Sequence, residues 1–447
     1  ARSRLIALES VQAIPIQMKI ELQLKRSIFF SNGKQFTADD ILQTYQLIKD
    51  ERFLSPYRPY IQGIRKIKKI SPFQVRIIFN PPIANWKNHL VFKILNHHEL
   101  KSVSPGTFRD QIFSGTGPLE FKHIYRPRQI ILAPNRYNHL KKIPRYREIH
   151  YDVIAYSHHH LFKLQKGEVD IIDIEPELMA SCQREPKLKR QFTVVPYQKF
   201  GYTYLVFNLT RKRITLNIRK AFFNFLHTGN FMQRFLKKRG VAVKTPFLLL
   251  NQRIPVPRYD QPPVIQPLKS QVRLRILCNR GSQIRSTFIQ FLAKGIRKYR
   301  IELVPEFVEH QLMLDRLRKK DFDIAISGFL LDLDFDLSDV LASKGYFNYA
   351  GYRSEKMDQL LKTGLLKQDR TEREMIYLDA HHQWQKDLPI LPLFNLYYHK
   401  GISKRILIPK HLPVMIDSSG DFLQDFDRWL YKSGKHINLS PNKNEPR

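Results

Sequence analysis

Cysteine is scarce in this sequence, and long apolar runs are missing. The chain of 447 residues has two cysteines, Cys182 and Cys278. They form neither a C-x-x-C motif nor a disulfide framework, so we expect two ordinary buried thiols. No apolar run approaches the roughly 18 to 20 residues that cross a bilayer, and the opening residues lack the regions of a signal peptide. The chain as given is expected to be soluble, but a signal removed before residue 1 would leave the same sequence, so the compartment stays open.

Catalytic motifs are also missing. The sequence contains no G-x-S-x-G elbow, no H-E-x-x-H pair and no P-loop, each of which is the local signature of a known chemistry. The glycine-rich stretch 115–118, GTGP, does not fit a phosphate loop, because the alternation of Leu119 and Phe121 behind it leads into a strand. We therefore predict that the protein is not an enzyme and has neither catalytic residues nor a cofactor.

Two patterns resemble metal ligands, and both are rejected. Asp332, Asp334 and Asp336 follow the D-x-D-x-D start of a calcium loop, but Leu337 and Ser343 occupy that loop's glycine and glutamate positions. Neighbouring histidines on a helix or strand point in different directions, so the histidine runs cannot ligate one ion. These runs are His97-His98, His158-His159-His160 and His381-His382. We expect no metal site, and we expect Asp334 and Asp336 to face solvent or cap a helix.

Acidic residues are outnumbered by basic ones. The chain has 75 Lys and Arg against 40 Asp and Glu, a formal charge of +35. The basic residues are dispersed, which is typical of a solvated surface and not of a dedicated nucleic-acid groove. We expect no specific nucleic-acid partner, and any binding to polyanions should be sequence-independent and lost with salt. One alternative that would use the charge is a cytoplasmic ligand-sensing domain of a transcriptional regulator, although no helix-turn-helix precedes residue 20.

The first hundred residues predict strands and one well-capped helix. Residues 20–30 are consistent with a strand that ends in a turn. Thr37, followed by Asp40, predicts the start of a helix that carries an apolar face through residue 48. Residues 73–82 alternate and then stop on two prolines, which predicts an edge strand.

The later part of the chain predicts an α/β fold. Residues 158–166 and 169–174 are consistent with a short helix and a strand. From residue 272 the order is strand, helix, strand, helix and strand, ending in the strand of residues 322–329. Two linked βαβ units imply a parallel sheet with helices on its faces. The proline-rich residues 241–271 between the α/β regions are interpreted as crossover and hinge material.

Six short motifs occur together in this order along the chain. They are FFSNGKQFTADDI, GTGPLEF with IILAPNRYN, LQKGEVDI, YLVFNLTRKRITLNIRKAF, FDIAISGF and PILPLF. With these motifs the sequence resembles the family 5 extracellular solute-binding proteins, the receptors for oligopeptides, dipeptides and some nickel or haem cargo. The resemblance covers most of residues 20–400. It makes GTGP a structural turn that brings a strand into the hinge region.

The resemblance implies a two-lobed periplasmic-binding-protein architecture, type II or Venus-flytrap, that closes on a ligand. It divides the chain into lobe one, an extra subdomain of lobe one, and lobe two. Lobe one would comprise residues 1–33, 111–245 and 396–447, the subdomain residues 34–110, and lobe two residues 246–395. The lead-in before residue 32 is shorter than the family's, so the first strands of lobe one, one of which lines the ligand site, are expected to be missing.

The resemblance also implies a ligand site. In peptide-binding members an aspartate after G-W-x-x anchors the α-amino group of the peptide, and here Gly328-Phe329-Leu330-Leu331-Asp332 matches that run. A carboxylate in a dry cleft can pair with an ammonium, while nearby extended backbone adds hydrogen bonds to the peptide. Without the motif, Asp332 could equally cap a helix or face solvent. The residues assigned to the site with it are Gly328, Phe329, Leu330, Thr116, Gly117, Tyr204 and Asn208.

This sequence departs from the family at the anchor. Phe329 stands where tryptophan is usual, and Leu333 where tyrosine is common. By its resemblance the chain is expected to be a monomeric peptide receptor, periplasmic or otherwise extracytoplasmic, that delivers its ligand to the membrane permease of an ABC transporter. The alternatives left open are the sensing domain above and a degenerate homologue without ligand.

Overall fold

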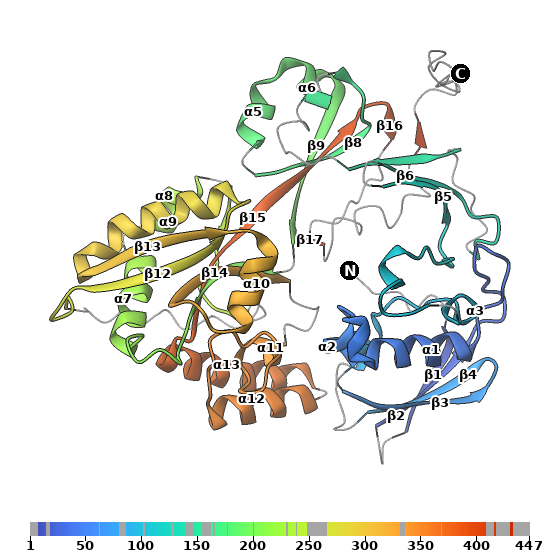
Figure 1. Ribbon diagram of the computed structural model, residues 1–447, viewed down its shortest axis with the longest axis horizontal. Helices are drawn as coiled ribbons and strands as arrows, with labels where there is room; N and C mark the ends of the chain where they lie inside the picture. The colour runs from blue at the N-terminus through green and yellow to red at the C-terminus, as the bar shows by residue number, and fades with distance from the viewer. Residues whose placement is uncertain are drawn as a thin grey trace. The chain divides into compact units, whose positions relative to one another are not determined.

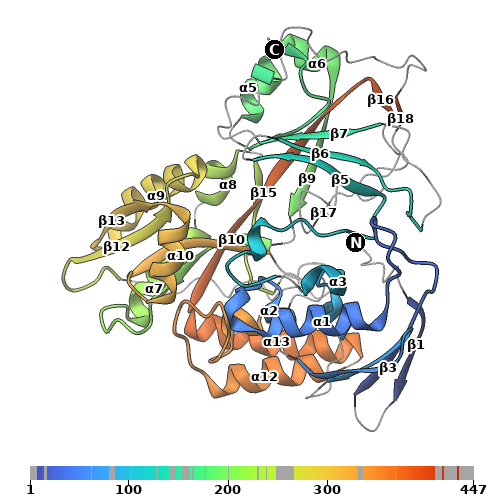
Figure 2. The ribbon, with the colours of Figure 1, turned by 45° about the vertical axis from the view of Figure 1, so that its right-hand side comes forward.

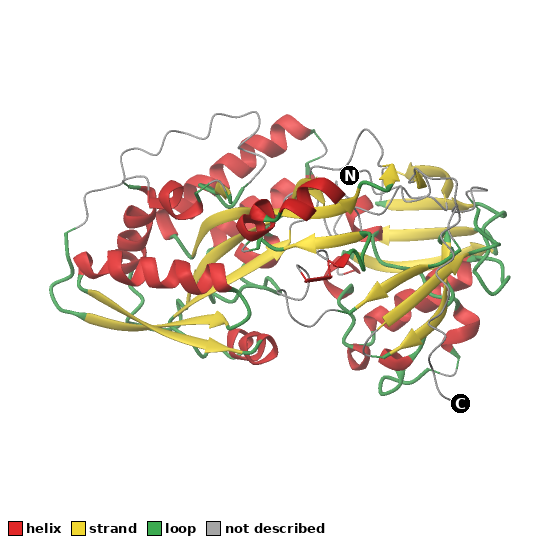
Figure 3. Cartoon of the chain, turned by 90° about the horizontal axis from the view of Figure 1, so that it is seen from above, coloured by secondary structure: helices red, strands yellow, loops and turns green. Residues whose placement is uncertain are grey.

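The structure is a computed structural model of the chain. It describes residues 8–14, 18–61, 63–79, 86–101, 103–126, 129–139, 147–153, 162–163, 166–176, 178–199, 201–228, 231–237, 239–247, 266–330, 336–367, 369–407, 415–416 and 430–431. Helices and strands alternate through most of this length (Figure 3). No helix among these residues combines the length and apolar character that a membrane span requires.

The chain divides into two compact units. Unit 1 comprises residues 1–117, 137–139 and 198–397, and unit 2 comprises residues 118–136, 140–197 and 398–447. Each unit draws on separate stretches of the sequence, as expected for a chain that crosses between lobes more than once. The predicted division placed residues 198–245 in lobe one and residues 246–395 in lobe two, whereas unit 1 contains both ranges.

Unit 1 begins with a four-stranded antiparallel sheet, here called the N-terminal sheet. Its order is β1-β2-β4-β3, and its strands are β1 (Leu8–Ile14), β2 (Lys19–Leu24), β3 (Ile64–Ser71) and β4 (Gln74–Phe79). Alternate residues of β2 and β4 are buried and pack with α1 (Ala38–Lys49) in one core. The prediction that residues 73–82 form an edge strand is wrong, because β4 lies between β2 and β3. Within the described residues the pairing of β4 with β3 runs from Gln74 to Phe79.

Helix α1 starts where the sequence predicts. Thr37 is its N-cap, and the Thr37 backbone N–H donates to Asp40 Oδ2 at 2.7 Å. The other Asp40 oxygen accepts from the backbone N–H of His97 at 2.8 Å, at the start of α3 (His97–Leu100). The capping residue predicted from the sequence thus also fixes a second helix. The short α2 (Arg58–Ile61) completes the helices of this region.

The second part of unit 1 is the predicted parallel α/β arrangement. Strand β12 (Val272–Asn279) is parallel to β13 (Ile301–Val308) and to β14 (Ile324–Leu330). Helices α9 (Gln283–Ile296) and α10 (His310–Arg318) connect them (Figure 1). The α9 face predicted to point inward is buried at Phe288, Ile289, Leu292 and Ile296. Both βαβ units are confirmed.

Two antiparallel strands extend this sheet. Its order is β13-β12-β14-β10-β15, with β10 (Gly201–Phe207) buried throughout and β15 (Ile390–Ser403) at its side. Strand β11 (Gly240–Ala242) pairs with residues 394–396 of β15, and a side chain at Gly240 would lie 2.4 Å from the Asn395 carbonyl. Residues 201–242 therefore share the sheet of residues 272–330, which is why they belong to unit 1. The helices around this sheet are α7 (Leu216–His227), α8 (Phe231–Leu236), α11 (Ser338–Leu341), α12 (Glu355–Leu366) and α13 (Arg370–Asp387).

Unit 2 contains shorter strands. Strands β5 (Leu119–Tyr125), β6 (Gln129–Pro134) and β7 (Ile149–Asp152) form an antiparallel sheet. The last residues of β15, which is one continuous strand (Figure 2), pair with β8 (Ile171–Ile174). The remaining elements are α5 (Met179–Arg184), α6 (Pro186–Gln191), β9 (Phe192–Lys199), β16 (Ile406–Leu407), β17 (Met415–Ile416) and β18 (Leu430–Tyr431). The predicted helix at 158–166 lies largely outside the described residues, as do His158, His159 and His160.

A buried histidine makes the stability of unit 1 depend on pH. His381 on α13 is fully buried, its Nδ1 lies 2.9 Å from Thr245 Oγ1, and burial, reinforced by His382, lowers the pKa of His381 to about 4. The His381 imidazole therefore takes up a proton near pH 6.5 in the unfolded state but only near pH 4 in the native state. This contribution to stability is complete above pH 6.5, falls between pH 6.5 and 4, and changes no further below pH 4.

We expect this single histidine to remove about 2 kcal/mol of stability between pH 7 and pH 5. The measurement is urea unfolding at both pH values, for the wild type and for His381→Gln. The variant should show the smaller fall, because its buried amide does not titrate. His227, whose pKa burial also lowers to about 4, is common to both proteins and cancels in the difference. Equal falls in the two proteins would contradict the prediction.

Candidate functional site

The carboxyl ends of the parallel strands in unit 1 are the natural place for a ligand. In open α/β sheets the binding crevice lies outside these ends. Strand β14 ends there at Leu330, and the antiparallel β10 begins there at Gly201, which is its register partner. The same ladder pairs Tyr202 with Phe329 and Thr203 with Gly328. The structure therefore gathers Tyr204, Gly328 and Phe329, predicted from separate motifs, at one end of the sheet.

Three aromatic side chains pack together at this end. The Phe329 ring lies 4.8 Å from that of Tyr202 and 5.0 Å from that of Tyr204, in both cases edge to face. The Tyr202 hydroxyl donates to the Pro246 carbonyl at 3.0 Å. Burial raises the pKa of Tyr204 far above its usual range, and a hydrogen bond with Ser327 and the charge of Arg285 oppose this rise. The tyrosines are therefore neutral, and they support Phe329, which is only partly buried.

The end of β14 also has a free edge. Strand β10 pairs with β14 along its whole length to Leu330. On the opposite side, β12 pairs with β14 only at Ile276↔Ile324 and Leu277↔Ala325 within the described residues. Among the described residues, 326–330 are therefore paired in register with a strand on one side only. An extended peptide can add to such an edge through its main-chain groups.

An arginine that the sequence analysis missed lies at this edge. Arg285 is in the first turn of α9, where its backbone N–H approaches the N-cap side chain Ser282 Oγ at 3.4 Å. A side chain at Gly328 would lie 2.9 Å from Arg285 Nη2, so glycine leaves the room that the guanidinium occupies. No carboxylate of the described residues lies within 4 Å of that guanidinium to form an ion pair. The sequence feature that could have identified Arg285 is its position in the first turn of α9, directly after β12, where an open α/β sheet holds its ligand.

Cys278 lies near Arg285 but is not a nucleophile. Burial raises the pKa of the Cys278 thiol to about 11, against the opposing charge of Arg285. Its Sγ lies 3.4 Å from the Asn279 carbonyl. Both Cys278 and Cys182 are buried free thiols, as predicted. The thiol at this end of the sheet therefore stays protonated at neutral pH.

Part of the predicted site falls outside the description. Asp332 and Asp334 lie outside the described residues, and of Leu330 only the backbone is described. Asp336 is described, and its Oδ1 accepts from the backbone N–H and the hydroxyl of Ser338, at 2.9 and 2.7 Å. Asp336 thus lies one residue before Leu337, the N-cap of α11, and its carboxylate holds the first residue of that helix.

Asn208 has a structural role at the opposite end of β10. Its Nδ2 donates to the carbonyls of Lys320 and Phe322, both at 2.8 Å, and its Oδ1 accepts from the backbone N–H and hydroxyl of Thr210. These four bonds use the whole hydrogen-bonding capacity of an asparagine side chain. The side chain is also fully buried. Asn208 is therefore not carried into the site proposed below.

Thr116 and Gly117 lie in the GTGP turn. The Ser31 backbone N–H donates to the Gly115 carbonyl at 2.9 Å, and Nδ1 of His139 lies 3.3 Å from the Thr116 carbonyl. Strand β5 starts directly behind the turn, at Leu119, as predicted. The turn thus joins three separate stretches of the chain. A ligand contact by either residue stays a prediction.

The sequence of this chain is similar to a known protein family and to individual proteins of bacteria. The model of a family described as bacterial extracellular solute-binding proteins, family 5 middle, matches residues 17–349. The chain is 20% identical over 441 residues to the oligopeptide-binding protein AppA of Bacillus subtilis, covering 91% of this chain and 80% of that protein. It is 22% identical over 423 residues to the probable D,D-dipeptide-binding periplasmic protein DdpA of Escherichia coli, covering 86% and 77%.

Solved structures agree on the fold. The chain matches AppA from Bacillus subtilis in complex with a nonapeptide at a TM-score of 0.79 and 18% identity, covering 96% of this chain and 90% of that one. It matches NikZ from Campylobacter jejuni in complex with Ni(L-His) at 0.80 and 17%, covering 95% and 90%. It matches the periplasmic binding protein DppA from Helicobacter pylori in complex with the peptide STSA at 0.75 and 17%, covering 96% and 89%. The predicted α/β periplasmic-binding-protein fold is confirmed.

Proposed function

Because this chain belongs to the bacterial extracellular solute-binding proteins of family 5, we propose that it captures peptides and delivers them to the membrane permease of an ABC transporter. The observation that carries the proposal is the family match across residues 17–349, together with relatives named for oligopeptide and dipeptide binding. Membership in a family of solute-binding proteins points to binding and not to catalysis. The family's description as extracellular supports a proposed action outside the cytoplasm.

The chemistry at the end of β14 supports a peptide ligand. The free edge of residues 326–330 offers main-chain hydrogen bonds to an extended backbone, and Phe329 offers an apolar surface. Asp332, two residues beyond β14 in the sequence, would pair with the peptide's α-amino group. Arg285 would pair with a carboxylate of the peptide. Backbone, ammonium and carboxylate are the groups that every short peptide shares, so this site would recognise peptides with little dependence on their side chains.

The experiment that tests the proposal is mass spectrometry of the ligand retained on the purified protein. Short peptides released by mild denaturation are the expected result. A protein that retains a metal chelate, or that binds no member of a di- to octapeptide library, would overturn the proposal. Size-exclusion chromatography with light scattering would test the proposed monomer in the same preparation.

Loss of the Arg285 charge is expected to weaken peptide binding by about 1.5 to 3 kcal/mol, the usual range for a hydrogen bond to a charged group. The variant is Arg285→Gln, and the measurement is calorimetric titration with a retained peptide and with its C-terminally amidated form. If Arg285 binds the terminal carboxylate, amidation of the peptide and the substitution should each reduce the binding free energy by the same amount. The two losses should not add when both changes are made.

The matched control is Arg280→Gln, in the same turn. Arg280 is exposed and lies 3.7 Å from Glu309, so its loss should leave the affinity unchanged. A loss in Arg285→Gln that is as large for the amidated peptide as for the free acid would exclude the terminal carboxylate as the partner of Arg285.

A further inference from the structure

The outward face of the N-terminal sheet carries a concentration of positive charge. Side chains alternate along β2 and β4, and one set packs with α1 in the core while the other set points away from it. In β3, whose register shifts twice, Ile64 and Ile67 are the buried residues. The register places Lys19, Ile78 and Lys66 in one row across the three strands, and Glu21, Arg76 and Lys68 in the next. These two rows hold four basic residues and one acidic residue.

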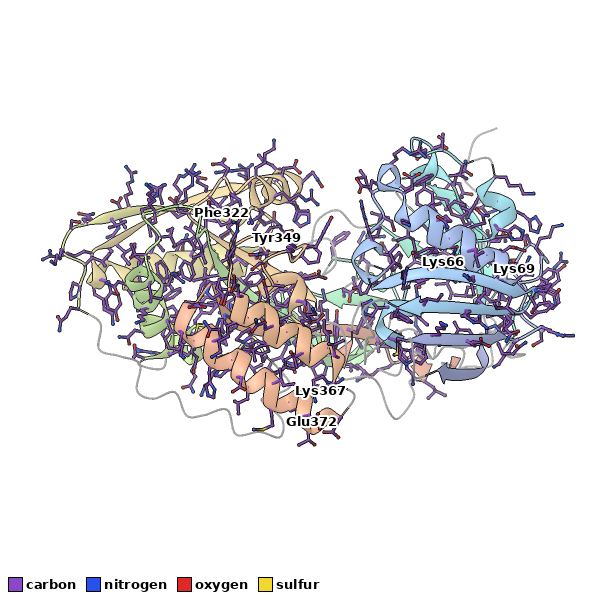
Figure 4. All side chains as sticks on the ribbon, turned by 90° about the horizontal axis from the view of Figure 1, so that it is seen from below. Lys66, Lys69, Phe322, Tyr349, Lys367 and Glu372 are labelled. Carbon is purple, nitrogen blue, oxygen red and sulfur yellow. The ribbon has the colours of Figure 1, made fainter. Side chains whose placement is uncertain are left out.

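Most of this charge is not neutralised within the protein. Arg76 pairs with Glu21 at 2.6 Å, which uses the one acidic residue of the two rows. Lys69 on β3 pairs with Asp39 of α1 at 2.7 Å and belongs to the helix side of the sheet (Figure 4). Lys19, Lys66 and Lys68 have no acidic partner among the described residues. Lys66 and Lys68 are exposed, and so is Arg65 beside them.

The spacing of these lysines leaves them repelling one another. Neighbouring strands lie about 4.8 Å apart, so Lys19 and Lys66 are about 10 Å apart at their Cα atoms, and Lys66 and Lys68 about 7 Å. Both separations are close to the Debye length of about 8 Å at physiological ionic strength. Anionic groups placed over the face would relieve this repulsion and gain attraction from every lysine at once.

We propose that the outward face of the N-terminal sheet, with Lys19, Lys66 and Lys68 at its centre, is a docking surface for an anionic phospholipid bilayer. Lys19 lies on β2, and Lys66 and Lys68 lie on β3, with β4 between the two strands, so the cations are spread in two dimensions, which matches a plane of headgroups and not a single linear polyanion. Ile78 lies between Lys19 and Lys66, and Ile70 at the end of β3 is 44% exposed, so apolar surface accompanies the charge. Lysines near an anionic membrane surface each add to the attraction, which falls off within a Debye length.

One other role would account for part of the pattern. Strand β3 is an edge strand, and lysines on an edge prevent pairing with a second chain. That role does not account for Lys19, because β2 is flanked on both sides by β1 and β4. The two roles also differ in consequence, since loss of edge protection produces aggregation, whereas loss of docking lowers partitioning of a monomeric protein.

The test is co-sedimentation of the full chain with vesicles. We expect binding to phosphatidylcholine vesicles that contain phosphatidylglycerol at low salt, and loss of that binding at high salt or with phosphatidylcholine alone. Partitioning should fall about fivefold for each lysine removed, and so about 100-fold for the triple variant Lys19→Gln, Lys66→Gln and Lys68→Gln.

The control is the triple variant Lys294→Gln, Lys356→Gln and Lys362→Gln. These lysines on α9 and α12 are exposed, and their removal changes the net charge equally. The control should bind vesicles within a few-fold of the wild type. Equal losses in the two triple variants would assign the effect to total charge and overturn the proposal. The proposal would also be overturned if the sheet variant aggregated while its remaining monomer bound vesicles as the wild type does. The same holds if the sheet variant lost binding to duplex DNA but kept its binding to vesicles.

Discussion

Replacing Asp332 with asparagine is expected to weaken the binding of a peptide by about 2 to 5 kcal/mol, because the change would remove one partner of the proposed charge pair with the peptide's α-amino group. The amide occupies the same volume as the carboxylate but cannot neutralise the peptide's ammonium. The expectation rests on the resemblance of the Gly328–Asp332 run to the family's anchor motif and on the structure's placement of Gly328 and Phe329 at the carboxyl end of β14. The fold should survive, so thermal melts of the variant and the wild type should agree.

Calorimetric titration with a peptide recovered from the protein measures this effect. Asp334→Asn serves as the control, because it changes a neighbouring aspartate to which we assign no ligand contact, and it should bind as the wild type does. N-acetylation removes the ammonium, so an acetylated peptide should bind the wild type and Asp332→Asn equally weakly. Wild-type affinity for the free peptide in Asp332→Asn would exclude the anchor, and a loss confined to acetylated peptides would contradict its proposed chemistry.

Removing the carboxylate of Asp323 is expected to destabilise unit 1 by about 1 to 3 kcal/mol, the range found when a buried hydrogen-bond donor loses its acceptor. Asp323 is fully buried at the start of β14. Its Oδ1 accepts from Arg213 Nε at 3.0 Å and Nη2 at 2.5 Å, and its Oδ2 accepts from the backbone N–H of Arg275 at 2.9 Å. Asp323→Ala would leave these donors without their acceptor at the point where β14 enters the sheet.

A neighbouring aspartate provides the control for this prediction. Asp321 contacts Arg275 at 3.1 Å and Arg316 at 3.0 Å, but its side chain is 49% exposed. Water and the remaining carboxylates can replace it, so Asp321→Ala should cost about 0.5 to 1 kcal/mol. Urea unfolding of the two variants beside the wild type measures the difference. Similar costs for the two substitutions would show that burial does not set the strength of this network.

Local patterns in the sequence predicted those parts of the fold that depend on neighbours along the chain. The cap of α1 was predictable because Thr37 and Asp40 meet within one turn of a helix, and the buried face of α9 was predictable because residues three and four apart share a side. The position of β4 was not, since edge and central strands differ in which other strand lies beside them. The two prolines at residues 81 and 82 favoured an edge, but β4 pairs with both β2 and β3.

Some residues of the candidate site could be predicted from the sequence, and others could be identified only in the fold. Motif order along the chain was enough to assign the chain to its family and to select Tyr204, Gly328 and Phe329, which the tertiary structure then brought into one cluster. Arg285 and the free edge of β14 could be found only from the fold. The first depends on the packing of α9 against Gly328, and the second on how far β12 pairs with β14. Asn208 shows the converse: its motif suggested a ligand contact, but the carbonyls of Lys320 and Phe322 and the N–H and hydroxyl of Thr210 use all four of its hydrogen bonds. The sequence alone determined the family and the α/β class, because both depend on short-range order, whereas the long-range pairing of strands decided which side chains meet at the proposed site.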